Sequence, residues 1–162
     1  MWAYTNEEID YLSAPGDFPA AFAGTHTPDI QVPDTQTAPR GELASRVLAM
    51  PADANPSGAV FGGWVMALMD AAGAMSATRL ADGRVVTVAV SNITFLQPIK
   101  VGDTVCCYAD VVRIGKTSVT LGVEVWVLRE GRGERQKVTN AEFTFVAVND
   151  GGKPRSLPCS PS

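Results

Sequence analysis

Four segments in the second half of the chain carry apolar and polar residues in partial alternation. They are rich in Val, Thr and aromatic residues, which is typical of β-strands. The segments are RVVTVAVSNITFL (84–96), DTVCCYADVVRI (103–114), TSVTLGVEVWVL (117–128) and KVTNAEFTFVAV (137–148). The connections between them, QPIKVG, GK and REGRGERQ, are short. Because a parallel crossover needs a dozen or more residues, we expect these strands to run antiparallel to their neighbours.

The first half of the chain contains a helical pattern instead. Trp64, Leu68, Ala71 and Met75 stand at i, i+4, i+7 and i+11, and this apolar stripe predicts a helix over residues 61–80. The sequence ADGR then ends the helix, and its glycine, Gly83, suits a C-terminal cap. Before the helix, ELASRVLAM (42–50) predicts a first strand and PADANPSG (51–58) a loop.

These elements predict an α+β fold in the order β-α-β-β-β-β. A five-stranded antiparallel sheet has one face to bury, and the helix is the only element available to cover it. The helix is apolar nearly all round, so one sheet cannot bury it completely. A second copy of the chain would complete the burial and protect the edge strands. We therefore expect at least a homodimer.

The length of 162 residues fits a single domain with extensions. Residues 1–39 are rich in Pro, Thr, Ala and Asp without sustained periodicity, and they predict an irregular N-terminal extension. We expect the domain to occupy residues 40–150 and a C-terminal tail to occupy residues 151–162.

Composition narrows the functional classes. A net charge of -4 argues against nucleic acid as the main partner. The apolar run 59–77 approaches membrane-spanning length but carries Asp70 and three glycines, so we expect no membrane span. A single histidine and three cysteines, of which Cys106 and Cys107 are adjacent, make a poor zinc site and a poor disulfide framework. We expect a cytoplasmic protein that holds no metal.

Asp70 is the one charged residue of the stretch NPSGAVFGGWVMALMDAAGAM (55–75). No Lys, Arg or His between residues 54 and 78 could neutralise it locally. Burying an unpaired charge is costly, so such a group survives mainly where its reactivity or hydrogen bonding is used. The alternative is a structural Asp that faces solvent or pairs with an Arg.

The start of the helix offers hydrogen-bond donors. The first turn of a helix leaves backbone N–H groups unsatisfied, and Gly62 and Gly63 place no side chain in front of them. Such a turn can bind an oxyanion, and Asp70 lies about two turns further along the same line of the helix. Asn55, in the preceding loop, fits a turn-forming residue or a donor that orients a water or a carbonyl, and the two roles are compatible.

Several of these motifs together resemble a known family. NPSGAVFGGW (55–64), MD (69–70), FLQPIKVGD (95–103) and the final GKPRSLP (152–158) closely resemble the hot-dog-fold acyl-CoA thioesterases, most of all the small bacterial acyl-CoA hydrolases of the YciA type. The resemblance covers roughly residues 40–158. It implies a sheet wrapped around one long central helix, paired as a homodimer, and further assembly as a hexamer, a trimer of dimers.

The resemblance also implies roles for individual residues. Asp70 would be catalytic, as a general base on water or as a nucleophile, and Asn55 of the other protomer would assist it. The N–H of Gly63, with that of Gly62, would stabilise the oxyanion. No cofactor is implied, and the substrate would be an acyl-CoA. The basic hairpin RIGKTS is a candidate contact for the CoA moiety through Arg113, Lys116, Thr117 and Ser118, and the alternative is a plain hairpin turn. Lys153 and Arg155 are weaker candidates for the phosphates of CoA, with a solvated charged tail as the alternative.

Two alternatives keep the fold and change the function. A hot-dog dehydratase or hydratase would need a histidine beside its carboxylate, and the single histidine, His26, lies in the irregular extension. A non-catalytic acyl-CoA-binding or sensing module would need the pocket without the base. The pair Asp70 and Asn55 favours the hydrolase over both.

Overall fold

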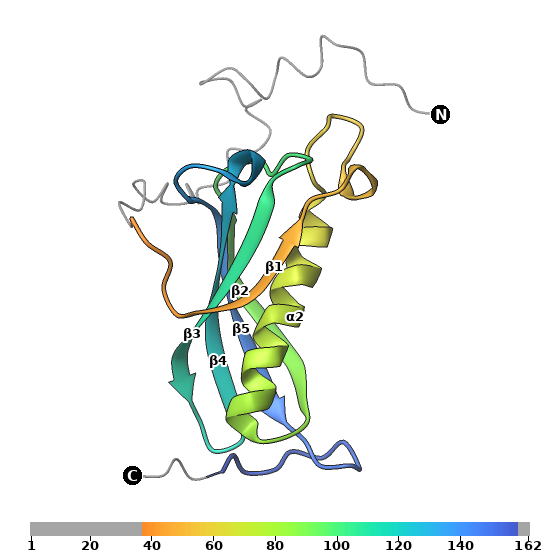
Figure 1. The fold of residues 1–162 in the computed structure, drawn as a ribbon. Helices are drawn as coiled ribbons and strands as arrows, with labels where there is room; N and C mark the ends of the chain where they lie inside the picture. The colour runs from red at the N-terminus through yellow and green to blue at the C-terminus, as the bar shows by residue number, and fades with distance from the viewer. Residues whose placement is uncertain (1–36, 159–162) are drawn as a thin grey trace, which may run out of the picture. The chain divides into compact units, whose positions relative to one another are not determined.

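The computed structural model describes residues 37–158 (Figure 1). The predicted extension 1–39, with His26, lies almost entirely outside these residues, and the domain limits stay a prediction. The elements are β1 (Glu42–Leu48), the 3-10 turn η3 (Pro51–Asp53), α2 (Gly62–Ala81), β2 (Val85–Phe95), β3 (Thr104–Ile114), β4 (Ser118–Leu128), the 3-10 turn η4 (Arg129–Gly131) and β5 (Gln136–Ala147). This order confirms the predicted β-α-β-β-β-β arrangement.

The five strands form one antiparallel sheet in the order β1-β3-β4-β5-β2. The consecutive strands β3, β4 and β5 are neighbours, as their short connections predicted. The same prediction for β2 and β3 was wrong, because the connection that contains QPIKVG is long enough to cross the end of the sheet over three strand spacings of about 5 Å each. Strand β2, which follows the helix, pairs with β5 and forms one edge of the sheet. Its pairing with β5 shifts register between Thr87 and Ala89 and again between Ser91 and Thr94.

Helix α2 lies across one face of the sheet and contacts all five strands (Figure 1). The buried side of the helix consists of Val65, Met69, Ala72, Gly73, Ala77 and Ala81. The stripe noted in the sequence lies at the margin of this buried side, because Trp64 and Leu68 are half-buried and pack against the core whereas Met75 is 53% exposed. Small residues allow the closest approach: a Cβ at Gly73 would lie 2.8 Å from the Phe145 ring.

The incomplete covering of α2 confirms the expectation that one sheet cannot bury this helix. Met66 and Leu80 remain exposed along with Met75. The edge strand β2 also exposes apolar surface, since Val86, Val88 and Val90 are about half exposed.

Helix α2 ends one residue earlier than a cap at Gly83 would suggest. Asp82 is the C-cap and adopts the left-handed conformation (φ 48°), and Gly83 follows with φ 141°. The Gly83 N–H donates to the Thr78 carbonyl. Arg155 also caps this end, because its Nη2 donates to the carbonyls of Ala81 (2.8 Å) and Asp82 (3.2 Å).

Candidate functional site

Asp70 lies in the middle of α2 and is half-buried. Its Oδ1 accepts a 2.6 Å hydrogen bond from the hydroxyl of Thr87 on β2. Within residues 37–158, no Lys or Arg forms an ion pair with it. The carboxylate is thus held by a neutral donor and keeps its second oxygen available.

Sequence reasoning missed Thr87. The contact forms because β2 returns alongside α2, and the pairing of β2 with β5 shifts register directly after Thr87. Such irregularities commonly redirect side chains beside functional sites. The only sequence signal is a hydroxyl residue within the apolar run VVTVAV.

The N-terminal turn of α2 presents donors as the sequence predicted. Phe61 is the N-cap and provides no side-chain hydrogen bond, and the first helical N–H with an intrahelical acceptor belongs to Val65, which donates to the Phe61 carbonyl. The preceding N–H groups, those of Gly62, Gly63 and Trp64, have no acceptor among the described residues. A Cβ at Gly63 would meet nothing within 4 Å, so the space beside this residue is open among the described residues.

Asn55 shapes the loop before the helix. Its Oδ1 accepts hydrogen bonds from the N–H of Ser57 (2.9 Å) and of Ala59 (3.1 Å), which is the turn-forming role expected from the sequence. Its Nδ2 has no acceptor among the described residues, so this amide still has two protons to donate. The turn-forming and donor roles therefore remain compatible.

One protomer does not bring all these groups together. No hydrogen bond within residues 37–158 joins Asn55 or the glycines to Asp70. Seven residues separate Gly63 from Asp70, which is about 10.5 Å along the axis of an α-helix. Asp70 is tied to the beginning of β2 through Thr87, whereas Gly62 lies against Phe95 at the end of β2.

The predicted CoA-binding hairpin joins β3 to β4. Arg113 and Lys116 are exposed and Thr117 and Ser118 are half-buried, and the Gly115 N–H closes the turn on the Ser118 carbonyl at 2.7 Å. Ser118 pairs with Val146 of β5, which in turn pairs with Val86 of β2. The hairpin therefore lies at the same end of the sheet as Thr87. Two strand spacings, about 10 Å, separate Ser118 on β4 from Val86 on β2.

The two weaker phosphate candidates separate in the structure. Arg155 is engaged in capping α2, as described above, and also donates from Nε to the Val148 carbonyl. Lys153 is exposed, and its side chain forms no ion pair among the described residues. Of the two side chains, only that of Lys153 makes no hydrogen bond among the described residues.

An apolar cleft of about 230 Å³ opens beside the N-terminal turn of α2. Its lining comes from the helix start, the end of β2 with the following loop, and β5: Val60, Gly62, Val65, Phe95, Gln97, Pro98, Ile99, Val138 and Thr139. The cleft shares Gly62 with the donor turn.

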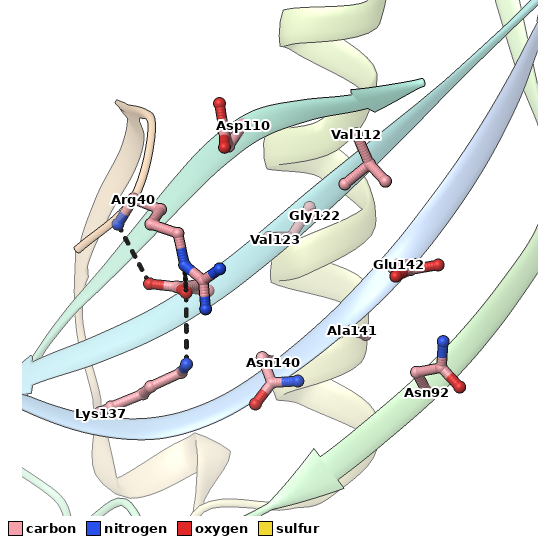
Figure 2. Close-up of a pocket in the computed structure, with 11 residues that line it drawn as sticks. Arg40, Asn92, Asp110, Val112, Gly122, Val123, Lys137, Asn140, Ala141 and Glu142 are labelled. Carbon is pink, nitrogen blue, oxygen red and sulfur yellow. Dashed lines mark hydrogen bonds and ion pairs between the residues drawn. The ribbon is translucent and has the colours of Figure 1, made fainter. Parts of the chain in front are cut away.

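A second, polar hollow lies on the face of the sheet opposite α2, as Figure 2 shows. Glu124 lies at one end of it, and its two carboxylate oxygens accept from the N–H and Nε of Arg40, Nζ of Lys137 and Nε1 of Trp126 at 3.0–3.2 Å. Burial acts to raise the pKa of Glu124. The hydrogen bond from Trp126, then that from the Arg40 N–H and the charge of Lys137, outweigh burial and hold the pKa below its ordinary range. The charges of this cluster satisfy one another, and the cluster lies away from Asp70.

The two adjacent cysteines are free and buried, on neighbouring positions of β3. Burial raises the pKa of the Cys107 thiol to about 11, so it stays protonated and unreactive at neutral pH. In residues 37–158, no three His, Cys, Asp or Glu side chains gather closely enough to hold a metal ion. None of the helices in this range has the length and apolar character needed to span a membrane.

Comparisons with known proteins point to one family. The family model of the thioesterase superfamily matches residues 57–134. The chain is 54% identical over 127 residues to the acyl-CoA thioester hydrolase YciA of Escherichia coli K12, across 76% of this chain and 96% of that protein.

Solved structures agree with this relationship. The hexameric thioesterase y2039 from Yersinia pestis superposes with a TM-score of 0.73 at 54% identity, covering 76% of this chain and all (100%) of that one. Cj0915, a hexameric hotdog-fold thioesterase of Campylobacter jejuni, superposes with a TM-score of 0.69 at 39% identity, covering 73% and 91% of the two chains.

Proposed function

This chain belongs to the acyl-CoA thioester hydrolases of the thioesterase superfamily, and we propose that it hydrolyses acyl-CoA at a site shared between two protomers. One protomer contributes Asp70 and Thr87, and its partner contributes a second Asn55 together with the donor turn of Gly62 and Gly63. The observation that carries the proposal is the separation of these two groups of residues within one protomer. The products are free CoA and a carboxylic acid.

Asp70 supplies the reactive group. In one route its carboxylate takes a proton from water, the water oxygen bonds to the thioester carbon, the C–S bond breaks, and the proton passes to the leaving sulfur. In the other route the carboxylate itself attacks, CoA leaves as the thiolate, and water then cleaves the mixed anhydride. The hydroxyl of Thr87 orients the carboxylate in both routes, because it holds one oxygen at 2.6 Å and leaves the other for the reaction.

The distance between the attacking oxygen and the oxyanion donors favours donor N–H groups from the partner protomer. An attacking oxygen about 3 Å from the carbonyl carbon and a donor about 3 Å from the oxyanion lie at most about 7 Å apart. The axial rise of about 10.5 Å between Gly63 and Asp70 exceeds that span. A water between the Asp70 carboxylate and the thioester would span the distance to Gly63 of the same protomer only if the carboxylate, the water, the carbonyl group and the donor lay in one straight line.

Pairing of two β2 edges would bring the separated groups together. Among residues 37–158, strand β2 has no neighbour on its outer edge and its valines are exposed, so it is suited to antiparallel pairing with the same strand of a second copy. A two-fold axis near Val90, the middle of the strand, places the Thr87 end of one β2 beside the Phe95 end of the other. Asp70 then approaches the partner's donor turn, and the half-exposed side of α2 becomes covered.

The remaining parts of the proposal follow from this dimer. The hairpin residues Arg113, Lys116, Thr117 and Ser118 lie at the Asp70 end of the sheet and contact the CoA moiety there. Since the solved relatives named above are hexameric, we propose a hexamer built as a trimer of dimers. The free thiols of Cys106 and Cys107 suit a reducing compartment, which supports the cytoplasm as the location.

Release of free thiol from acyl-CoA tests the activity. The purified protein should release free CoA from acyl-CoA, and a thiol-reactive dye detects the released thiol. Asp70→Asn should lower kcat by roughly a hundredfold or more while keeping the fold and the dimer. Turnover of Asp70→Asn near that of the wild type would refute the assignment of Asp70. Binding of acyl-CoA without thiol release at any chain length would instead identify a non-catalytic acyl-CoA-binding module.

A further inference from the structure

The apolar cleft beside the donor turn has a lining suited to an alkyl chain. Two of its lining side chains are polar, and both are engaged elsewhere. The Thr139 hydroxyl donates to the Thr94 carbonyl at 2.6 Å, and the Gln97 Oε1 accepts from Arg129. The other side chains that line the cleft are aliphatic or aromatic, so it offers mainly hydrophobic contact, and the side-chain NH2 of Gln97 is its one side-chain donor without an acceptor among the described residues.

The position of the cleft fixes which part of a substrate can enter it. Gly62 belongs both to the cleft and to the turn whose N–H groups we assigned to the oxyanion. The ring of Phe95 lies 3.4 Å from the position of a Cβ on Gly62. A thioester whose carbonyl oxygen sits on that turn therefore has the cleft beside its carbonyl carbon.

We propose that this cleft holds the acyl chain and that Phe95 sets how many carbons it accepts, an inference that rests on the proposed function. A cavity of about 150 Å³ accommodates benzene, which has six carbons, so each carbon needs roughly 25 Å³. The volume of about 230 Å³ then corresponds to about nine carbons. The substrate class is a short- to medium-chain acyl-CoA. Each added methylene raises kcat/KM only until the chain reaches about nine carbons.

Phe95 is the lining residue that can change this limit without disturbing the core. Its side chain is 51% exposed, whereas Val65, Ile99 and Val138 are buried in the core cluster. Replacing it with alanine removes a ring from the wall of the cleft, and replacing it with tryptophan adds one. Leu96, the next residue, is 48% exposed and does not line the cleft, so Leu96→Ala is a matched control.

The test is kcat/KM for saturated acyl-CoA substrates from two to sixteen carbons, each normalised to the value for acetyl-CoA. For the wild type, kcat/KM should rise up to roughly fourfold per methylene and stop rising at about eight to ten carbons. Phe95→Ala should move this limit at least two carbons longer, and Phe95→Trp should move it shorter. Leu96→Ala should follow the wild-type curve.

The outcomes separate this inference from the function on which it rests. If no substrate releases thiol, the hydrolase proposal fails. If the protein hydrolyses acyl-CoA but the three curves of wild type, Phe95→Ala and Phe95→Trp have the same limit, the cleft does not hold the chain. A wild-type curve that keeps rising to sixteen carbons would equally overturn the inference, and in both cases the hydrolase function would stand.

Discussion

The hydrogen bond between Thr87 and Asp70 gives the sharpest test of the proposed site. Thr87→Val keeps the shape of the side chain and its β-branch but removes the hydroxyl that donates to Oδ1 of Asp70. The fold should tolerate this change, because Thr87 lies on the edge strand and is exposed in the protomer. Any loss should therefore fall on activity rather than on stability.

The geometry sets the size of the effect. At 2.6 Å the contact has the length of a hydrogen bond from a hydroxyl to a carboxylate. Hydrogen bonds to charged groups contribute about 1.5–3 kcal/mol, which corresponds to roughly 10- to 150-fold in rate. Water competes for the hydrogen bond between Thr87 and Asp70, because the pair is partly exposed. The effect should therefore lie at the lower end of this range, and we expect kcat/KM to fall by about tenfold.

The assay compares Thr87→Val with Thr87→Ser. Serine restores the hydroxyl without the methyl group, so it should recover most of the activity if the hydrogen bond matters and little of it if the β-branch does. The two variants should have the same circular dichroism spectrum and the same oligomeric state as the wild type. Activity of Thr87→Val within threefold of wild type, or equal losses in both variants, would refute the positioning role.

Three further predictions concern other parts of the molecule. Mixed dimers of Asn55→Ala and Asp70→Asn protomers should regain part of the activity that each variant lacks, and verified mixed dimers without recovery would contradict a shared site. Gly73→Ala should destabilise the protein by about 1 kcal/mol in urea unfolding, because contact with the Phe145 ring costs more than the helix gains from alanine; a more stable variant would contradict this packing. Glu124→Gln should lower the free energy of unfolding at pH 7 by about 1–3 kcal/mol. Because the pKa of Glu124 is lowered by folding, the wild type should lose this advantage as the pH falls below about 4.5, and a pH-independent difference would count against the ionised cluster.

The order and type of the elements followed from the sequence because each has a clear period and clear boundaries. The helix and all five strands differ from the predicted limits by at most two residues. The side of the helix that faces the sheet did not follow from the sequence, for a physical reason. In a helix that is apolar nearly all round, the largest residues define the most visible stripe, yet the small residues Ala72, Gly73 and Ala77 allow the sheet to approach.

The candidate site could be predicted only where its residues lie close in sequence. Asp70, Asn55 and the glycine pair fall within sixteen residues. The isolated carboxylate pointed to chemistry by itself, and the family resemblance supplied the proposed roles. Thr87 could not be found this way, because its contact depends on how β2 returns beside the helix. The cluster around Glu124 was missed for the same reason, since Arg40 is 84 positions away in sequence.

Three features of the protomer have a single explanation in the shared site. Within residues 37–158, the outer side of α2 is incompletely covered and the β2 edge is unpaired and apolar, and the donor turn lies too far from Asp70 of the same helix for direct attack. Pairing of β2 with its copy would resolve all three, because one contact buries the valines, covers the helix and brings each carboxylate to the other protomer's donors. It follows that a protomer alone would form its core and sheet but hold only half of each site. Mutations that separate the dimer should therefore abolish hydrolysis without unfolding the chain, and they should do so even when Asp70, Thr87 and Asn55 are all intact.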